Sequence, residues 1–207
     1  MRKDVLAGVG VGAALLGGAA LYFLRERSTE EPDYRALESE GDHQIRDYPS
    51  LTVAETVVEG SRGDALDKGY RILADYLAAR SREGDKLEFS VPVMQDGGDP
   101  MASDPPLFDD DLEGAAWRTR FVMPASADEL PDPPEGIELV ELPARRVAVV
   151  SFAGRATDRL LKEQEDRLRG WLAKRGEKSN SEPEFAFYNS PMIPGPLRRN
   201  EVWLALS

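Results

Sequence analysis

The chain has 207 residues, no cysteine, one histidine and a formal net charge of −12 at pH 7. The absence of cysteine excludes disulfides, thiolate metal sites and a cysteine nucleophile, and a single histidine excludes the common zinc sites. An acidic surface repels phosphate backbones, so the composition predicts that nucleic acid is not a partner.

The chain begins with an apolar segment. Val5–Leu24 is uncharged, and basic residues flank it on both sides. At 1.5 Å per residue, a helix of this length is about 30 Å long, which matches the hydrocarbon core of a bilayer. A cleaved signal peptide is the alternative, but no small-x-small cleavage site separates the apolar run from the charged flank. We therefore expect a transmembrane anchor over 1–27 and a polar linker over 28–33.

The folded domain is expected over 34–207. The positive charges on the two sides of the anchor nearly balance, and the N-terminal amine tips the balance toward an N-terminus in the cytoplasm. The domain is therefore expected on the extracytoplasmic (periplasmic) side of the membrane.

An internal repeat organises the rest of the chain. Ile45–Gly60 aligns without gaps with Leu139–Gly154, at an offset of 94 residues (139 minus 45). The identical pairs are Pro49 and Pro143, Val53 and Val147, Ala54 and Ala148, and Gly60 and Gly154. The repeats extend over about 43–124 and about 137–207. Two such halves, each with one apolar sheet face, are expected to bury those faces together around a pseudo-two-fold axis.

Each half is predicted to contain a strand followed by a helix. Leu51–Val58 and Arg146–Phe152 are rich in β-branched residues and predict strands. A helix capped by Asp64 follows the first strand, and a helix capped by Thr157 or Asp158 follows the second. Gly176 is expected to end the second helix. The residues expected to face inward are Leu66, Tyr70, Leu73 and Leu77 in the first helix, and Leu161, Gln164, Leu168, Trp171 and Leu172 in the second.

After each helix the sequence has an apolar segment with a proline and then a last strand. Phe89–Met94 and Tyr188–Ile193 are the apolar segments, and Pro92 and Pro191 take similar places in them. The last strands are expected over 117–123 and 200–206, and 95–114 and 125–136 are expected to be loops. The predicted fold class is α+β, built from duplicated strand–helix–strand–strand units.

Three blocks of sequence resemble the SOUL heme-binding family. They are HQIRDY at 43–48, VPV at 91–93 and FYNSPMIPGPLRRNEVWL at 187–204. The resemblance covers about 34–206. It implies a pseudo-symmetric, barrel-like β-sheet with two long helices, and a hydrophobic cleft for heme or another tetrapyrrole near the first helix and the C-terminal strands. The positions that match the cleft are Leu66, Tyr70, Leu73, Ala74, Tyr188, Met192 and Trp203.

Several polar residues are candidates for contacts with such a ligand. His43 is the only imidazole and the obvious axial iron ligand, although a structural role is the alternative. Tyr188 can ligate ferric iron as a phenolate or can simply pack beside proline. Arg118 and Arg120 can pair with heme propionates through bidentate hydrogen bonds, or can serve the structure.

These features predict a membrane-anchored, non-covalent binding protein for heme or a related tetrapyrrole, acting as a buffer or carrier. The alternative is a module on the same fold that binds another hydrophobic small molecule or a protein. An enzyme is not expected, because the spacing supports no Ser-His-Asp set and the chain has no cysteine. The acids associated with the repeats that can turn inward are Glu38, Glu55, Glu88 and Glu201.

Overall fold

The computed structural model describes residues 30–88, 90–98 and 115–206. The first half contains β1 (Arg35–Glu40), β2 (His43–Tyr48), β3 (Leu51–Glu59), α2 (Arg62–Leu77), β4 (Val93–Gly97) and β5 (Ala116–Val122). The second half contains η1 (Ala127–Glu129), β6 (Glu138–Leu142), β7 (Arg145–Ala153), α3 (Asp158–Lys174), β8 (Glu184–Phe187), η2 (Gly195–Leu197) and β9 (Arg199–Leu206). The predicted anchor at Val5–Leu24 lies outside these residues. None of the helices described here has the length and apolar character needed to cross a bilayer.

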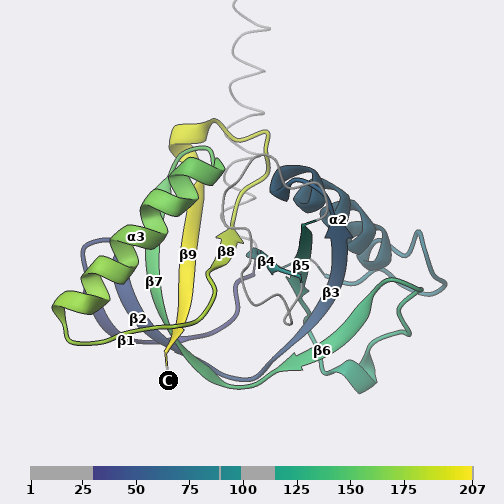
Figure 1. The fold of residues 1–207 in the computed structure, drawn as a ribbon. Coiled ribbons are helices and arrows are strands. Elements are labelled where there is room, and N and C mark those ends of the chain that lie inside the picture. Colours follow the sequence, from purple (N-terminus) through teal and green to yellow (C-terminus); the bar gives the residue numbers. More distant parts are fainter. Residues whose placement is uncertain (1–29, 89, 99–114, 207) are drawn as a thin grey trace, which may run out of the picture.

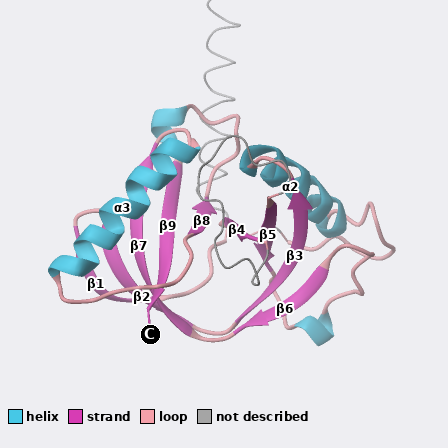
Figure 2. Ribbon diagram, viewed as in Figure 1, coloured by secondary structure: helices cyan, strands magenta, loops and turns pink. Residues whose placement is uncertain are grey.

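The strands form one curled antiparallel sheet with the two long helices on the same face (Figures 1 and 2). The strand order is β1-β2-β7-β9-β8-β4-β5-β3-β6. The α+β class and the two helices were predicted, but the unit differs from the prediction. The segments that open the repeats form the additional strands β2 and β6, so β1, β2 and β3 precede α2, and β6 and β7 precede α3 within the second half.

The registers of the two halves show the pseudo-two-fold symmetry. β3 and β7 are 94 residues apart (145 minus 51), and β5 and β9 begin 83 residues apart (199 minus 116). The central pair is β4–β8, where Gln95 lies opposite Phe185. Each half also gives its leading strand to the other half, since β2 pairs with β7 and β6 pairs with β3. The repeat found in the sequence therefore corresponds to two interlocked halves.

One predicted equivalence between the halves is wrong. Pro92 directly precedes β4, whereas Pro191 follows β8 and lies in the connection to β9. The residue directly before β8 is Pro183. Tyr188–Ile193 is therefore not a strand that corresponds to Phe89–Met94. The similarity of the two segments came from one proline in a short apolar run, which does not fix a register.

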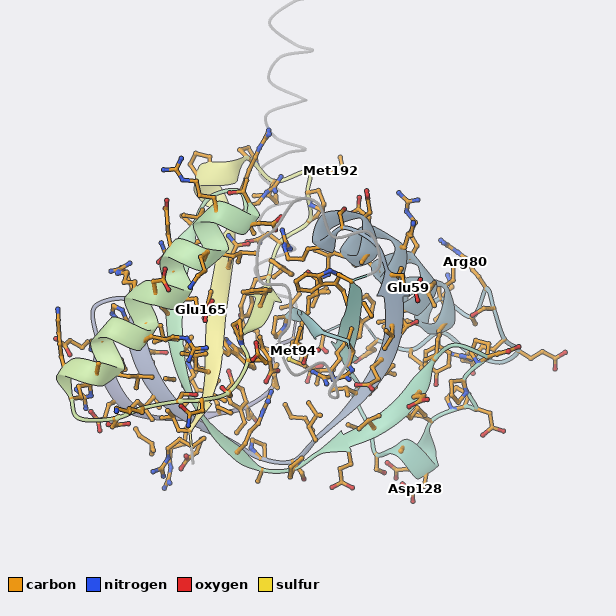
Figure 3. All side chains as sticks on the ribbon, in the orientation of Figure 1. Glu59, Arg80, Met94, Asp128, Glu165 and Met192 are labelled. Carbon is orange, nitrogen blue, oxygen red and sulfur yellow. The ribbon has the colours of Figure 1, made fainter. Side chains whose placement is uncertain are left out.

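Apolar side chains pack in three clusters. One lies under α3 and includes Leu161, Leu168 and Phe185, and a second lies under α2 and includes Leu73 and Phe121. The third contains no helical residue, so it belongs to the face of the sheet that points away from the helices. Its members are Tyr48, Val53, Val91, Met94, Val122, Val147, Val149, Ala186, Tyr188 and Trp203. Figure 3 shows one of them, Met94, near the centre of the sheet.

The helix ends follow local rules better than the helix faces do. Ser61 rather than Asp64 caps α2, and Thr157 caps α3 as one of the two predicted alternatives. Gly176, with a positive φ of 76°, follows the last turn of α3 as predicted.

The buried face of α2 differs from the expected one. Tyr70 is exposed, and Gly69 beside it is buried. The helix approaches β5 so closely there that a Cβ on Gly69 would lie 2.6 Å from Oγ1 of Thr119. In α3, Glu165 is buried in addition to the expected apolar residues.

We expect the substitution Gly69→Ala to destabilise the domain by about 1–3 kcal/mol, because the added methyl group overlaps Thr119 on β5. The matched control is Gly170→Ala in α3, where a Cβ would meet no atom within 4 Å and where alanine favours the helix. Urea denaturation of the two variants measures both changes. Equal stability of the two variants would show that α2 does not rest on Thr119.

Candidate functional site

A buried ion pair joins the first and last parts of the domain. Glu201 lies on β9, and its side chain has no exposed surface. Arg46 on β2 donates two parallel hydrogen bonds to it, with distances of 2.9 Å from Nη1 to Oε2 and 3.0 Å from Nη2 to Oε1. This bidentate geometry is the strongest arrangement available to a carboxylate and a guanidinium group. The ion pair holds β2 to β9 across the intervening β7.

The carboxylate of Glu201 receives further hydrogen bonds on both oxygens. Tyr188 donates to Oε2 at 2.7 Å and Trp203 donates to Oε2 at 2.8 Å, while Ser151 and Arg199 both donate to Oε1 at 2.9 Å. Burial raises the pKa of this carboxyl group, but the hydrogen bonds and charges of Arg46 and Arg199 outweigh it and hold the pKa at about 2. Each oxygen already accepts at least three hydrogen bonds, so Glu201 is placed as a structural anchor rather than as a proton acceptor.

The start of the domain covers this cluster. The guanidinium carbon of Arg46 lies 4.3 Å from the centre of the Tyr34 ring, and that ring packs against Tyr48 with 5.3 Å between centroids. Glu31 accepts a hydrogen bond from Arg199 at 2.8 Å. The segment of residues 31–34 therefore binds to the same cluster that joins β2 and β9.

A second group of charges lies nearby on the same face of the sheet. Arg120 on β5 is paired with Glu55, 2.7 Å away, and with Asp96. Arg118 lies 3.5 Å from Glu55 and 3.6 Å from Asp96. Burial raises the pKa of Asp96 to about 6, although Arg120 beside it acts in the opposite direction. The two arginines predicted to bind propionates are thus already paired with acids, on the face that points away from α2.

The remaining predicted residues do not form one cluster. Leu66, Leu73 and Ala74 lie on α2. Leu73 is fully buried between the helix and the sheet, and Leu66 and Ala74 are half-buried. Tyr188 and Trp203 belong to the cluster on the other face of the sheet. Tyr70 and Met192 are the exceptions, since they are 43% and 80% exposed. Figure 3 shows Met192 at the edge of the molecule, beside the N-terminal end of α2 in this view.

Neither candidate iron ligand is accessible. His43 stacks on Trp171 with 5.1 Å between ring centroids, and its Nε2 is buried without a hydrogen-bond partner. Burial lowers the pKa of this imidazole, which favours its neutral form. The hydroxyl of Tyr188 donates to Glu201, and burial holds its pKa well above 10. An iron ion therefore meets neither side chain unless neighbouring residues move. In the described part of the chain, no cluster of three or more histidine, aspartate or glutamate residues is arranged to hold a metal.

Reasoning from sequence missed Arg46 and Tyr48 as members of the central cluster. Both belong to the HQIRDY block, and Glu201 belongs to the RRNEVW block. A signal was present, because the first block contains an arginine and the second contains a glutamate. What the sequence did not show is that the two charges meet 155 positions apart in the chain.

The chain belongs to the SOUL heme-binding protein family, whose model matches residues 29–205. A search of curated proteins gives no match.

Solved structures of other proteins share the fold. The crystal structure of the EcmrR C-terminal domain has a TM-score of 0.57 at 10% identity, with 84% of this chain and 98% of that chain covered. A hydrolase from Listeria innocua has a TM-score of 0.55 at 11% identity, with 83% of this chain and 94% of that chain covered. At these identities the likeness concerns the fold alone.

We expect Arg46→Met to destabilise the domain by about 3–5 kcal/mol, because it leaves the charge of Glu201 buried beside its remaining partners. The control is Arg35→Met, which removes an ion pair whose arginine side chain is 74% exposed and should change little. Denaturant unfolding at pH 7 measures both variants. Comparable losses in the two would contradict a central role for the buried pair.

The same pair predicts a pH dependence. The pKa of Glu201 is lowered from 4.5 to about 2 by folding, so its stabilising contribution is present above pH 4.5 and is lost as the pH falls toward 2.

Proposed function

We propose that this protein binds heme or a related tetrapyrrole on the apolar surface beside α2, and that it acts as a buffer or carrier rather than as an enzyme. The proposal rests on the family and on one structural observation. Of the residues that match the family's cleft, Tyr70 and Met192 are left exposed to solvent. Large apolar side chains that stay exposed on a folded domain are suited to cover the flat face of a porphyrin.

The binding mode that we infer has no strong axial ligand. His43 is enclosed by Trp171, and Tyr188 is held by Glu201. Contact between apolar side chains and the porphyrin ring then supplies the affinity. The iron of a bound heme would add its spectroscopic signal, and it would sit against apolar residues.

The placement of the acids supports a non-catalytic function. Both carboxylate oxygens of Glu201 already accept hydrogen bonds from several donors, and Glu55 is paired with Arg120. Glu38 is paired with Arg175, and Glu88 is exposed to solvent. General acid–base catalysis needs an acid with a free oxygen in a sheltered position, and these four residues offer none.

We expect hemin to bind the full-length protein with saturable one-to-one stoichiometry in a titration followed at the Soret band. Tyr70→Ala and Met192→Ala should each weaken binding by about tenfold, because each removes apolar contact area. The matched control is Val57→Ala, since Val57 is 49% exposed but lies on β3 away from α2. His43→Ala and Tyr188→Phe should leave the wavelength of the Soret band unchanged.

The outcomes of this titration separate the alternatives. A Soret shift lost in His43→Ala would show that the imidazole ligates the iron, against the proposed mode. If iron-free protoporphyrin binds saturably and hemin does not, the proposed site stands and its ligand is a tetrapyrrole without iron. No saturation with either compound would end the tetrapyrrole proposal and favour a protein-interaction module, for which the supporting observation is that no described strand pairs with the outer side of β6.

We further propose that the N-terminal segment anchors the domain to a membrane on the extracytoplasmic side. Five residues separate Leu24 from Glu30, and a connection of this length reaches at most about 20 Å. The full chain should stay in the membrane fraction after a carbonate wash, and a chain that begins at Ser28 should not. Release of the full chain by the wash would contradict an integral anchor.

A further inference from the structure

The two edges of the sheet are occupied differently. At one edge β1 covers the outer side of β2 as an antiparallel strand. At the other edge lies β6, and within residues 30–88, 90–98 and 115–206 no strand pairs with its outer side (Figure 1). Because β2 and β6 are equivalent in the internal repeat, the strand position that β1 fills beside β2 is filled by no described strand beside β6.

The sequence explains why the second half does not fill this position itself. At the offset of 94, the residues that correspond to β1 are 129–134, and they include Pro131, Pro133 and Pro134. Proline has no backbone N–H and cannot donate to a strand ladder. The carbonyl of Pro131 instead accepts a hydrogen bond from the hydroxyl of Tyr76 on α2 at 2.6 Å. The turn η1 lies beside β6, but no backbone hydrogen bond between described residues joins the two.

The charges at the two edges show which strand β6 would accept. On β2, Asp47 is bound by Arg35 of β1 at 2.9 Å and by Arg146 at 2.8 Å. The equivalent residue on β6 is Glu141, which is exposed and makes no ion pair with a described residue. Its neighbour on β3 is Thr52 rather than an arginine.

The surroundings of β6 are acidic as well. Residues 128–141 contain no basic side chain, and the acids there are Asp128, Glu129, Asp132, Glu135, Glu138 and Glu141. Figure 3 shows Asp128 on η1 at this end of the molecule. An incoming segment with positive charge is therefore attracted to this edge.

We propose that the outer edge of β6 is a docking site for an extended segment of a partner protein, which pairs antiparallel with β6 and places an arginine or lysine opposite Glu141. Backbone hydrogen bonds to the sheet edge hold the segment, and the acids select a basic one. The site is independent of tetrapyrrole binding, because it lies at the edge strand and not on α2.

The test uses the full-length protein and a synthetic ten-residue peptide. The peptide has the sequence of residues 33–42 with Asp33→Asn, Glu38→Thr, Ser39→Lys, Glu40→Thr and Asp42→Asn, so that it carries two basic and no acidic side chains, and Arg35 and the new lysine fall opposite Glu141 and Glu138. A second, acidic peptide differs from the first only in having glutamate at positions 35 and 39. Fluorescence anisotropy measures binding, and hydrogen exchange locates it. We expect the basic peptide to bind saturably below about 1 mM and to protect residues 137–142.

The protein variant Glu141→Lys should bind the basic peptide about tenfold more weakly than the wild type does, and it should bind the acidic peptide more tightly. The control Glu59→Lys makes the same change of charge on an exposed residue at the far end of β3, and it should bind like the wild type. Equal binding by both variants, protection elsewhere in the chain, or no saturation would overturn the proposal. Self-association that Glu141→Lys abolishes would identify a second copy of the chain as the occupant, against a partner of different sequence.

Discussion

In each half of this domain, the strand that opens the internal repeat needs a partner from the other half. β2 pairs with β7 of the second half, and β6 pairs with β3 of the first half. A strand with an unpaired edge and one apolar face gains little by folding alone. The sheet is therefore complete only when both halves interlock, and the central pair β4–β8 lies on the pseudo-two-fold axis that relates them.

The distribution of charge follows from this interlocking. The face of the sheet away from the helices carries both the Glu201 cluster and the arginines of β5, and neither is free to meet a ligand. Buried charges persist only when they are paired and hydrogen-bonded. Because that face is committed to structure, the exposed side chains beside α2 and the outer edge of β6 are the surfaces proposed for ligand and protein contacts.

Prediction from sequence succeeded where a signal was local or periodic. The cap at Thr157, one of two predicted alternatives, and the end of α3 at Gly176 depend on neighbouring residues, and both are present. The 94-residue repeat is periodic, and its two copies form matching strands and helices. The face of α2 was misjudged at Tyr70, because the contact between Gly69 and Thr119 that orients the helix is a tertiary one.

The candidate site was predictable only in part. The residues that match the family's cleft fall on both faces of the sheet, and spacing along the chain does not tell which face a side chain takes in a curled sheet. The pairing of Arg118 and Arg120 with acids of β3 and β4 likewise depends on strand order.

The separation of Arg46 and Glu201 along the chain bears on how the protein is made. During synthesis the arginine emerges 155 positions before its carboxylate, and β9 is the last strand to appear. An N-terminal fragment therefore carries an arginine whose buried place is not yet formed, together with strands whose partners are still missing. Long-range contacts of this kind slow folding, and the sheet is completed only after β9 has been made. A chain cut short before β9 lacks the carboxylate that pairs with Arg46 and the strand that lies between β7 and β8.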